Sequence, residues 1–348
     1  MTQPSNPDVV DRPGPNGAER LVQMGEMVFV TWALQVIATL GVADRMAGRP
    51  RPVDEVAAEC RADPDALYRV LRLLGMHGVV HEVAPRQFAL TPLGESLRTD
   101  APDSVHSWFV MNAPIYRVLF EAPLESVRTG RPAFADVLGA PFFEYAATDA
   151  EWGAVFDAAM GDLGRRTAAA VVQAYDFGAF ERIVDVGGGT GTLISAILDA
   201  APDARGTIFD LAHVADRARA ALAAVGLAAR CDVVTGDFFE AVPAGADAYV
   251  LSWVIHDWDD DRAAAILANC RRAMASGGRV LLVESAMPEG DEPHLAKSMD
   301  IAMLVALGGR ERTVPEYRAL LARACLELQR VIPADAAMSV FEAIAMTP

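Results

Sequence analysis

Short apolar segments alternate with longer, alanine-rich segments in the second half of the chain. Each short segment is rich in β-branched residues, as in a buried strand, and the segments between them have the length and spacing of helices. This alternation is typical of a doubly wound α/β domain, a parallel sheet with helices on both faces, in which ligands bind beyond the carboxyl ends of the strands. The predicted strands are Ile183–Val186, Gly206–Phe209, Cys231–Val234, Ala248–Leu251, Arg279–Val283 and Ser339–Ala345.

Helical spacing of apolar residues marks the N-terminal part of the chain. Ala18–Met46 predicts one or two helices interrupted near Gly25, and Pro64–Gly78 predicts a helix with a proline in its first turn. Residues 79–90 alternate between apolar and polar around Pro85-Arg86, which predicts a small β-hairpin. Helices followed by a hairpin outline a winged helix, a fold that serves either dimerisation or DNA binding.

The charge balance decides between these two uses. The chain of 348 residues carries a formal net charge of -17 and has a pI of about 4.7. Nucleic acids and anionic membranes bind basic surfaces, so neither is an expected partner. The helix of the winged-helix outline carries Arg69 and Arg72 but also Asp63 and Asp65. We therefore predict a homodimer that forms through this domain.

Three features indicate in which cellular compartment the protein resides. Residues 1–17 contain four prolines and two glycines, which predicts a disordered tail and not a signal peptide. Met27–Ala43 has no charge over 17 residues, fewer than the ~20 that usually span a membrane, so we predict a helix buried on all sides, as in a subunit interface. Cysteines without C-x-x-C spacing indicate reduced thiols in a cytoplasmic protein and no metal or disulfide; they are Cys60, Cys231, Cys270 and Cys325.

Aromatic and methionine residues are frequent between residues 103 and 178. This region predicts helices broken at Pro114, Pro123, Gly130–Pro132 and Pro141. Most of its large apolar side chains would form helix core, but a few would line a flat apolar pocket suited to an aromatic substrate. The candidates for that pocket are Trp108 and Met111.

A glycine-rich turn, I-V-D-V-G-G-G-T-G, follows the first strand of the sheet. Glycine allows positive φ and close approach of a ligand, and such a turn directs the N–H groups of the next helix at the ligand. The glycines are Gly187, Gly189 and Gly191, whereas a dinucleotide fingerprint would place its third glycine at position 192. With Asp185 two positions before the turn, this spacing favours S-adenosylmethionine (SAM), which has no pyrophosphate, over NAD.

Acidic residues stand at the ends of the next two strands. Asp210 lies about 20 residues past the glycines, where an acid holds ribose hydroxyls in SAM and NAD sites alike. The third strand leads into T-G-D-F-F, where Asp237 can accept from an adenine amino group and Phe238 can pack on the adenine ring. The alternative for Asp237 is a turn or helix cap.

His256 follows the apolar run of the fourth strand and is flanked by Asp257 and Trp258. Its place at the strand end nearest the cofactor favours a general base. We assign the three aspartates after Trp258 to the cap of the next helix. Glu284 ends the fifth strand and Glu311 precedes a further helix, and two acids that converge on one histidine would orient it.

Taken together, V-D-V-G-G-G-T-G, F-D-L, G-D-F-F, H-D-W-D-D, E-S and G-G-R-E-R-T resemble the motifs of SAM-dependent O-methyltransferases. The branch is the caffeate/flavonoid type of plants with its bacterial natural-product relatives, and the resemblance covers almost the whole chain. It implies a Rossmann-like SAM-binding sheet after a helical, winged-helix-like dimerisation domain. The implied parts are a tail (1–17), a dimerisation domain (18–102), a helical linker with the acceptor pocket (103–178) and a catalytic domain (179–348).

The resemblance also implies roles for individual residues. His256 matches the catalytic base, and Glu284 and Glu311 match the acids that orient it. SAM, with S-adenosyl-L-homocysteine as its product, is expected to contact Asp185, Gly187, Gly189, Asp210, Leu211, Asp237, Phe238, Ser252 and Trp258. The acceptor is expected to contact Trp108, Met111, Met160, Asp257, Met299, Asp300 and Met303.

One departure and three alternatives stay open. The family often has a basic residue at one of the two positions before V-I-H-D-W, where this chain has Ser252 and Trp253. The retained histidine favours transfer to a hydroxyl, and a Mg²⁺-binding carboxylate set is not found. The alternatives are methylation of nitrogen or carbon, a non-catalytic SAM- or DNA-binding regulator, and an NAD dehydrogenase, which the glycine spacing opposes.

Overall fold

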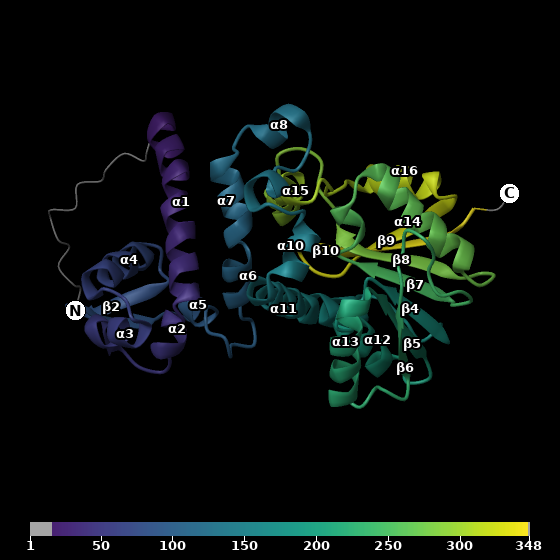
Figure 1. The fold of residues 1–348 in the computed structure, drawn as a ribbon, viewed down its shortest axis with the longest axis horizontal. Helices are drawn as coiled ribbons and strands as arrows, with labels where there is room; N and C mark the ends of the chain where they lie inside the picture. The colour runs from purple at the N-terminus through teal and green to yellow at the C-terminus, as the bar shows by residue number, and fades with distance from the viewer. Residues whose placement is uncertain (1–15, 347–348) are drawn as a thin grey trace, which may run out of the picture. The chain divides into compact units, whose positions relative to one another are not determined.

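The computed structural model describes residues 16–346 and folds into two compact units that divide between Val110 and Met111 (Figure 1). Residues 1–15 of the predicted tail lie outside the described residues. Its last two residues, Asn16 and Gly17, are the cap and the first residue of helix α1, which therefore begins one residue earlier than predicted.

The N-terminal unit combines helices with an antiparallel sheet of order β1-β3-β2. The predicted hairpin is present as β2 (Val80–Ala84) and β3 (Gln87–Leu90). The predicted helix is α4 (Pro64–Met76), which Asp63 caps and whose buried leucines pack in the core of this unit. The other elements are α1 (Gly17–Thr39), α2 (Val42–Arg45), β1 (Arg51–Pro52), α3 (Val53–Cys60), α5 (Pro92–Glu95) and α6 (His106–Met111).

Helix α1 contradicts one prediction. It continues through Gly25, because a glycine within a helix costs only about 1 kcal/mol relative to alanine, and the break falls at Gly41, where φ is 62°. Burial of this helix in a subunit interface stays a prediction, because one face of α1 is exposed within the single chain. The helix is long and apolar enough to cross a membrane, a criterion that core helices of soluble proteins also meet. Its large apolar side chains that are 48% exposed or more are Leu21, Val22, Met24, Met27, Phe29 and Trp32.

A seven-stranded sheet of order β6-β5-β4-β7-β8-β10-β9 lies at the centre of the C-terminal unit (Figure 1). All six predicted strands are present, and each is longer than predicted by one or two residues. The five strands from β4 to β8 pair in parallel. Their bounds and that of the last strand are β4 (Arg182–Val186), β5 (Arg205–Asp210), β6 (Cys231–Thr235), β7 (Ala248–Ser252), β8 (Arg279–Ser285) and β10 (Met338–Ala345).

The prediction of a parallel sheet is wrong at one edge. Strand β10 pairs antiparallel with both β8 and β9 (Leu326–Pro333), and β9 was not predicted at all. Most side chains of β9 are exposed or half-buried, because it is the outermost strand. An edge strand needs no continuous apolar run, and this explains why the hydrophobic pattern did not reveal it.

Helices cover both faces of the sheet and form two cores. The adjacent β4 residues Ile183 and Val184 belong to different cores, as the alternation of side chains along a strand requires. Helices α11 (Ala150–Ala174), α12 (Thr192–Ala200) and α13 (Ala212–Ala224) contribute to the first core. Helices α14 (Asp260–Ala273) and α16 (Val314–Arg323) contribute to the second. The doubly wound architecture is thus confirmed.

Short helices precede the sheet, and a longer one lies between strands β8 and β9. Pro114 lies in the first turn of α7, just after the break between α6 and α7, and the other predicted breaks fall between or before helices. The ring of Phe142 lies 5.2–5.5 Å from those of Phe134, Trp152 and Phe156, so much of the aromatic content forms core. These helices are α7 (Ala113–Glu121), α8 (Glu125–Thr129), α9 (Phe134–Leu138), α10 (Phe142–Thr148) and α15 (Leu295–Ala306).

The four cysteines are all free thiols, as predicted. Cys231 and Cys270 are buried, and burial raises the pKa of each thiol to about 12. Such thiols stay protonated at neutral pH and are poor nucleophiles and metal ligands.

Candidate active site

The glycine turn joins β4 to α12 and has the predicted open geometry. Gly187, Gly189 and Gly191 have positive φ values of 70°, 56° and 83°. A Cβ atom on Gly187 would lie 2.8 Å from Cγ2 of Val254 and 3.9 Å from the ring of Phe238. Val254 and Phe238 therefore pack close to Gly187, whereas the space beside Gly189 is open, as a ligand that approaches the backbone requires.

Asp210 ties the end of β5 to this turn. Its Oδ2 accepts a hydrogen bond from the N–H of Gly189 at 2.8 Å, and its Oδ1 accepts from the N–H of Leu211 at 2.6 Å. A carboxylate has about four acceptor positions, so Asp210 keeps acceptor capacity for a pair of hydroxyl groups. Leu211 is 49% exposed beside it.

Asp185 lies beneath the turn. Its side chain is buried, and a Cβ atom on Gly188 would lie 2.7 Å from its Cγ. Burial, together with the charge of Asp210, raises the pKa of Asp185 to about 7. Its Oδ2 has no hydrogen-bond partner within the described chain. Asp185 thus packs against the backbone of the turn at Gly188.

Aromatic rings flank the loop after β6. Phe238 lies 4.9 Å from Phe239 and 6.0 Å from Trp258, measured between ring centroids. Asp237 accepts from the N–H of Phe239 at 2.8 Å, the turn-capping contact given as its alternative role. Asn269, which the sequence did not single out, donates to the carbonyls of Phe238 and Phe239 at 2.7 and 3.0 Å. Side chains from α14 therefore fix this loop.

Trp258 offers a second unsatisfied polar atom. Its indole Nε1 is buried and has no partner among residues 16–346, although a buried indole N–H usually finds one. The guanidinium of Arg262 lies 4.1 Å from the centre of the same ring, and Phe143 stacks on it at 6.0 Å. An orphaned donor, a glycine cradle and a free carboxylate surface are the features that a nucleoside cofactor would use.

His256 sits in a short 3₁₀ turn, Ile255–Asp257, after β7 and is 4% exposed. Its Nδ1 lies 2.8 Å from Oε1 of Glu311, and its Nε2 lies 3.3 Å from Oδ1 of Asp257. Glu311 fixes the ring and its tautomer from one side, and Nε2 faces the carboxyl group of Asp257 on the other.

Glu284 acts on the same turn through the backbone. Its Oε1 accepts from the N–H groups of Val254 and Ile255 at 3.1 and 2.7 Å. It therefore holds the peptide that carries His256, whereas Glu311 holds the ring. Val254 also meets Gly187, so the histidine turn and the glycine turn are neighbours.

The ionisable groups around His256 shift one another's pKa values. Burial raises the pKa of Glu284 to about 7 and that of Asp257 to about 6. Burial alone would lower the pKa of His256, but the charges of Asp257, Glu284 and Glu311 outweigh it and raise the pKa to about 10. The neighbouring acids thus favour the protonated form of the imidazole.

The predicted acceptor residues are brought together only in part. Oδ1 of Asp300, in α15, accepts from the N–H of Glu311 at 2.9 Å, which joins Asp300 to the cluster around His256. Trp108 belongs to the N-terminal unit. Met111 is buried, and its carbonyl accepts from the indole of Trp152 at 3.0 Å. The remaining methionines lie on α11 (Met160, half-buried) and α15 (Met299, half-buried, and Met303, buried).

Four further findings concern the region around His256 and the possible ligand sites. Trp253 packs edge-on against His256 at 5.3 Å and has a φ of 56°, a value that no sequence pattern announced. A cavity of about 520 Å³ is lined by residues that include Asp260, Asp300 and Gly309, but by none of the residues predicted to bind the cofactor. Ser252 ends β7 and is half-buried. Residues 16–346 contain no group of three or more His, Cys, Asp or Glu that could hold a metal ion.

Comparison with known proteins places these features in context. The family described as O-methyltransferase domain matches residues 120–327, and the O-methyltransferase dimerisation domain matches residues 23–100. The chain is 43% identical to phenazine O-methyltransferase of Lysobacter antibioticus, over 93% of this chain and 95% of that protein.

Two further matches bear on the chemistry. A crystal structure of an O-methyltransferase from neocarzinostatin biosynthesis, in complex with S-adenosyl-L-homocysteine and 1,4-dihydroxy-2-naphthoic acid, matches with a TM-score of 0.80 and 38% identity over 91% of this chain and 96% of that one. The 8-amino-8-demethylriboflavin N,N-dimethyltransferase of Streptomyces davaonensis is 35% identical over 97% of this chain and 98% of that protein.

Proposed function

Because the chain belongs to the family of SAM-dependent O-methyltransferases, we propose that it methylates a hydroxyl group of an aromatic small molecule, with His256 as the general base. The observation that carries the proposal is the His256–Glu311 contact of 2.8 Å beside the glycine turn. The named relatives act in natural-product chemistry, which supports a role in secondary metabolism and antibiotic biosynthesis.

We propose that the cofactor binds across the carboxyl ends of strands β4, β5 and β6. Gly187 and Gly189 would face the methionine end of SAM, Asp210 the ribose, and Asp237 with Phe238 the adenine. When bound, SAM supplies an electrophilic methyl group on a positively charged sulfur, and a positive charge beside an imidazolium lowers its pKa. The residues that complete the site are proposed to be Asp185, Leu211, Ser252 and Trp258.

His256, Glu311 and Glu284 would then have separate roles in the reaction. A free phenol has a pKa near ~10 and is mostly protonated at neutral pH. His256 would take this proton at Nε2, while Glu311 holds Nδ1 and Glu284 holds the turn. General base catalysis contributes ~10²–10⁴-fold, and alignment of reacting atoms about 3 Å apart supplies as much again. The acceptor pocket is proposed to use Asp257, Asp300 and the methionines of α11 and α15, with Trp108 and Met111.

Transfer to nitrogen is the second candidate, and one relative supports it. The riboflavin N,N-dimethyltransferase shares nearly the full length of this chain, so overall similarity does not exclude an amine acceptor. An amine needs less help from a base than a phenol does, because its lone pair can attack before the proton leaves. The retained His256–Glu311 pair therefore favours a hydroxyl.

The test is an acceptor screen with methyl-labelled SAM and mass spectrometry of the products. Dihydroxynaphthoic acids and hydroxyphenazines would be paired with analogues that carry an amino group in place of the hydroxyl. We expect methylation of a hydroxyl acceptor, no methylation of its amino analogue, and the same rate with and without a metal chelator. Methylation of the amino analogue alone would contradict O-transfer, and activity that chelation removes and Mg²⁺ restores would contradict a metal-free site.

The exposed face of α1 is proposed to form a homodimer contact, since residues 23–100 match the dimerisation domain of the family. Phe29 and Trp32 are 59% and 54% exposed, and burial of such a side chain contributes about 1.5–3 kcal/mol. We expect the double variant Phe29→Glu/Trp32→Glu to be monomeric at micromolar concentration by sedimentation velocity. Met76→Glu, at a side chain that is 74% exposed on α4, is the control and should leave the dimer intact. A double variant that stays dimeric would place the interface elsewhere.

The remaining assignments follow from the charge and the relatives. With a net charge of -17, the protein is proposed to be a cytoplasmic enzyme that binds neither nucleic acid nor membrane. Residues 18–102 are proposed as the dimerisation domain, 103–178 as the acceptor-pocket region and 179–348 as the catalytic domain.

A further inference from the structure

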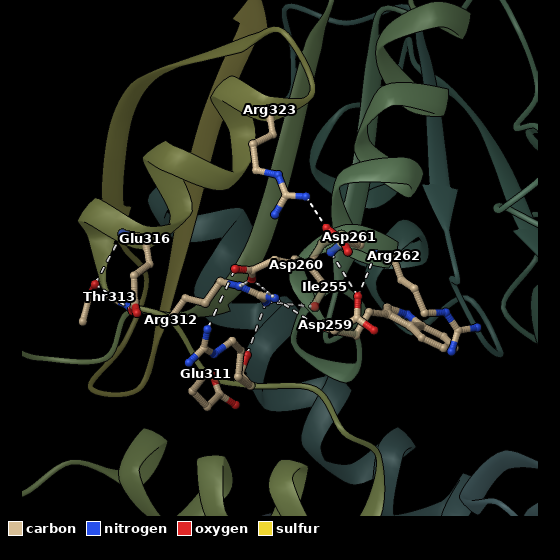
Figure 2. A network of polar contacts seen from close by, with 12 residues as sticks. Ile255, Asp259, Asp260, Asp261, Arg262, Glu311, Arg312, Thr313, Glu316 and Arg323 are labelled. Atoms are coloured by element: carbon tan, nitrogen blue, oxygen red, sulfur yellow. Dashed lines mark hydrogen bonds and ion pairs between the residues drawn. The ribbon is translucent and has the colours of Figure 1, made fainter. Parts of the chain in front are cut away.

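We infer that Arg312 is a positioning residue that fixes the geometry between His256 and Glu311; the inference rests on the proposed function. Arg312 follows Glu311 directly in the chain and is 1% exposed, which makes it the largest fully buried side chain of the described protein. A buried guanidinium is unfavourable unless its donors are satisfied. The partners of Arg312 therefore indicate what the charge is used for (Figure 2).

Three of its contacts are backbone carbonyls. Nη1 donates to the carbonyl of Ile255 at 3.1 Å and to that of Arg310 at 3.3 Å, and Nη2 donates to the carbonyl of Trp258 at 2.8 Å. Ile255 begins the 3₁₀ turn that carries His256, and Trp258 is the residue just after it. One rigid, planar group thus holds both ends of the turn.

The remaining contacts anchor the guanidinium itself. Nε and Nη2 donate to the same oxygen, Oδ1 of Asp260, at 3.0 and 2.8 Å. Asp260 lies in the first turn of α14, where the sequence assigned it to the helix cap. The cap is Asp259, whose Oδ1 accepts from the N–H groups of Asp261 and Arg262. Asp260 is instead the counter-ion of Arg312 (Figure 2).

The residues just before Arg312 also contact the His256 turn. The N–H of Arg310 donates to the carbonyl of His256 at 2.8 Å. A Cβ atom on Gly309 would lie 2.0 Å from that carbonyl oxygen and 2.4 Å from the carbonyl carbon of Asp257, so the two backbones touch. Segment 309–312 therefore holds the His256 turn by backbone and by Arg312, while Glu311 in its middle holds the imidazole.

This arrangement assigns distinct tasks to neighbouring residues. Glu311 sets the tautomer of His256, and Arg312 keeps the two at the distance that this contact needs. Lysine cannot reproduce the role, because an ammonium group lacks the fixed fork that reaches two carbonyls and a carboxylate at once. A misplacement of about 1 Å in an active site can lower the rate about 10²-fold.

The test compares Arg312→Lys and Arg312→Met with Arg323→Lys in the full-length protein. Arg323 pairs with Asp261, the neighbour of Asp260, but has no contact to the turn (Figure 2). We expect kcat to fall about 10-fold in Arg312→Lys and about 100-fold in Arg312→Met, with the dissociation constant of SAM within about twofold of the parent by calorimetry. Arg323→Lys should match the parent in both.

A spectroscopic measurement needs no acceptor. The Nδ1 proton of His256 bonded to Glu311 should give a low-field proton resonance that His256→Ala lacks; it should shift or broaden in both Arg312 variants and stay in Arg323→Lys. If the parent methylates no acceptor but the resonance responds in this way, the proposed function fails and the positioning role stands. An unchanged resonance with unchanged kcat would overturn the inference, as would a loss of SAM binding in proportion to kcat.

If neither Arg312 variant folds, Asp260→Asn provides the same comparison. Asp260 is 44% exposed, so its substitution buries no new charge and leaves the carbonyl contacts of Arg312 in place. We expect a smaller loss of kcat, about 3–10-fold, with SAM binding retained and the resonance shifted. No change in kcat or in the resonance would contradict the role of the Arg312–Asp260 pair.

Discussion

Replacement of His256 by alanine is expected to lower kcat by about 10²–10⁴-fold and to leave SAM affinity within about twofold of the parent. The imidazole contacts Glu311 and Asp257 and none of the groups proposed to hold the cofactor. Its removal therefore takes away proton transfer but not the cofactor site. Single-turnover rates with labelled SAM and calorimetry with S-adenosyl-L-homocysteine measure the two effects separately.

The pH dependence of kcat/KM in the parent and in His256→Ala provides a second test of the proposed base. A base must be neutral to accept a proton, and the neighbouring acids raise the pKa of His256 to about 10 in the free protein. The value of kcat/KM for SAM, which reports the free enzyme, should therefore rise with pH from 7 towards about 10 in the parent. In His256→Ala, any remaining rise should follow the pKa of the acceptor phenol (~10 for a free phenol) and move when that pKa changes. The profile of the control His81→Ala, at an exposed histidine of β2, should match the parent. A rise in His256→Ala that does not depend on the pKa of the acceptor would assign the base to another group.

Replacement of Asp210 by alanine should have the opposite signature, a loss of SAM binding. A hydrogen bond to a charged group contributes about 1.5–3 kcal/mol, and each 1.4 kcal/mol is a factor of ten. We expect the dissociation constant of SAM to rise about 10–100-fold. Part of this loss would come from the turn, because the N–H of Gly189 also donates to Asp210.

Two comparisons make the Asp210 measurement specific. Asp210→Asn keeps one carbonyl acceptor and should give an intermediate loss of affinity, whereas Asp203→Ala, at an exposed aspartate before β5, should bind SAM as the parent does. At saturating SAM, Asp210→Ala should recover much of the parental kcat. Unchanged affinity by calorimetry would refute the ribose role.

The sequence predicted the parts of the site that local patterns encode. The strands and the glycine turn with its positive φ values depend on residues within a few positions of one another. The pairing of His256 with Glu311 spans 55 positions and was inferred from resemblance to a family, not from spacing. Topology brings the two together, because both precede helices at the same edge of the sheet.

The rest could not be predicted, since it depends on contacts that no periodicity reports. Arg312 stands in an R-E-R run, and consecutive charged residues usually lie on the solvent-exposed surface. The side chain is buried instead, and it donates to a carbonyl more than 50 positions away. Trp253 adopts a positive φ, although positive φ values are usually found at glycine or asparagine. Asp260 is one of three consecutive aspartates whose different partners become visible only in three dimensions.

The backbone contact between Gly309 and the His256 turn limits which substitutions this part of the protein can accept. No side chain lies between the two segments, so mutation has no gradual way to adjust their spacing. New acceptor preferences are expected to arise on helices such as α11 and α15, where methionines can be exchanged without changing residues 309–312 or the His256 turn. A directed-evolution library that randomises Met160 and Met299 while sparing residues 309–312 should therefore yield altered selectivity at little cost in turnover.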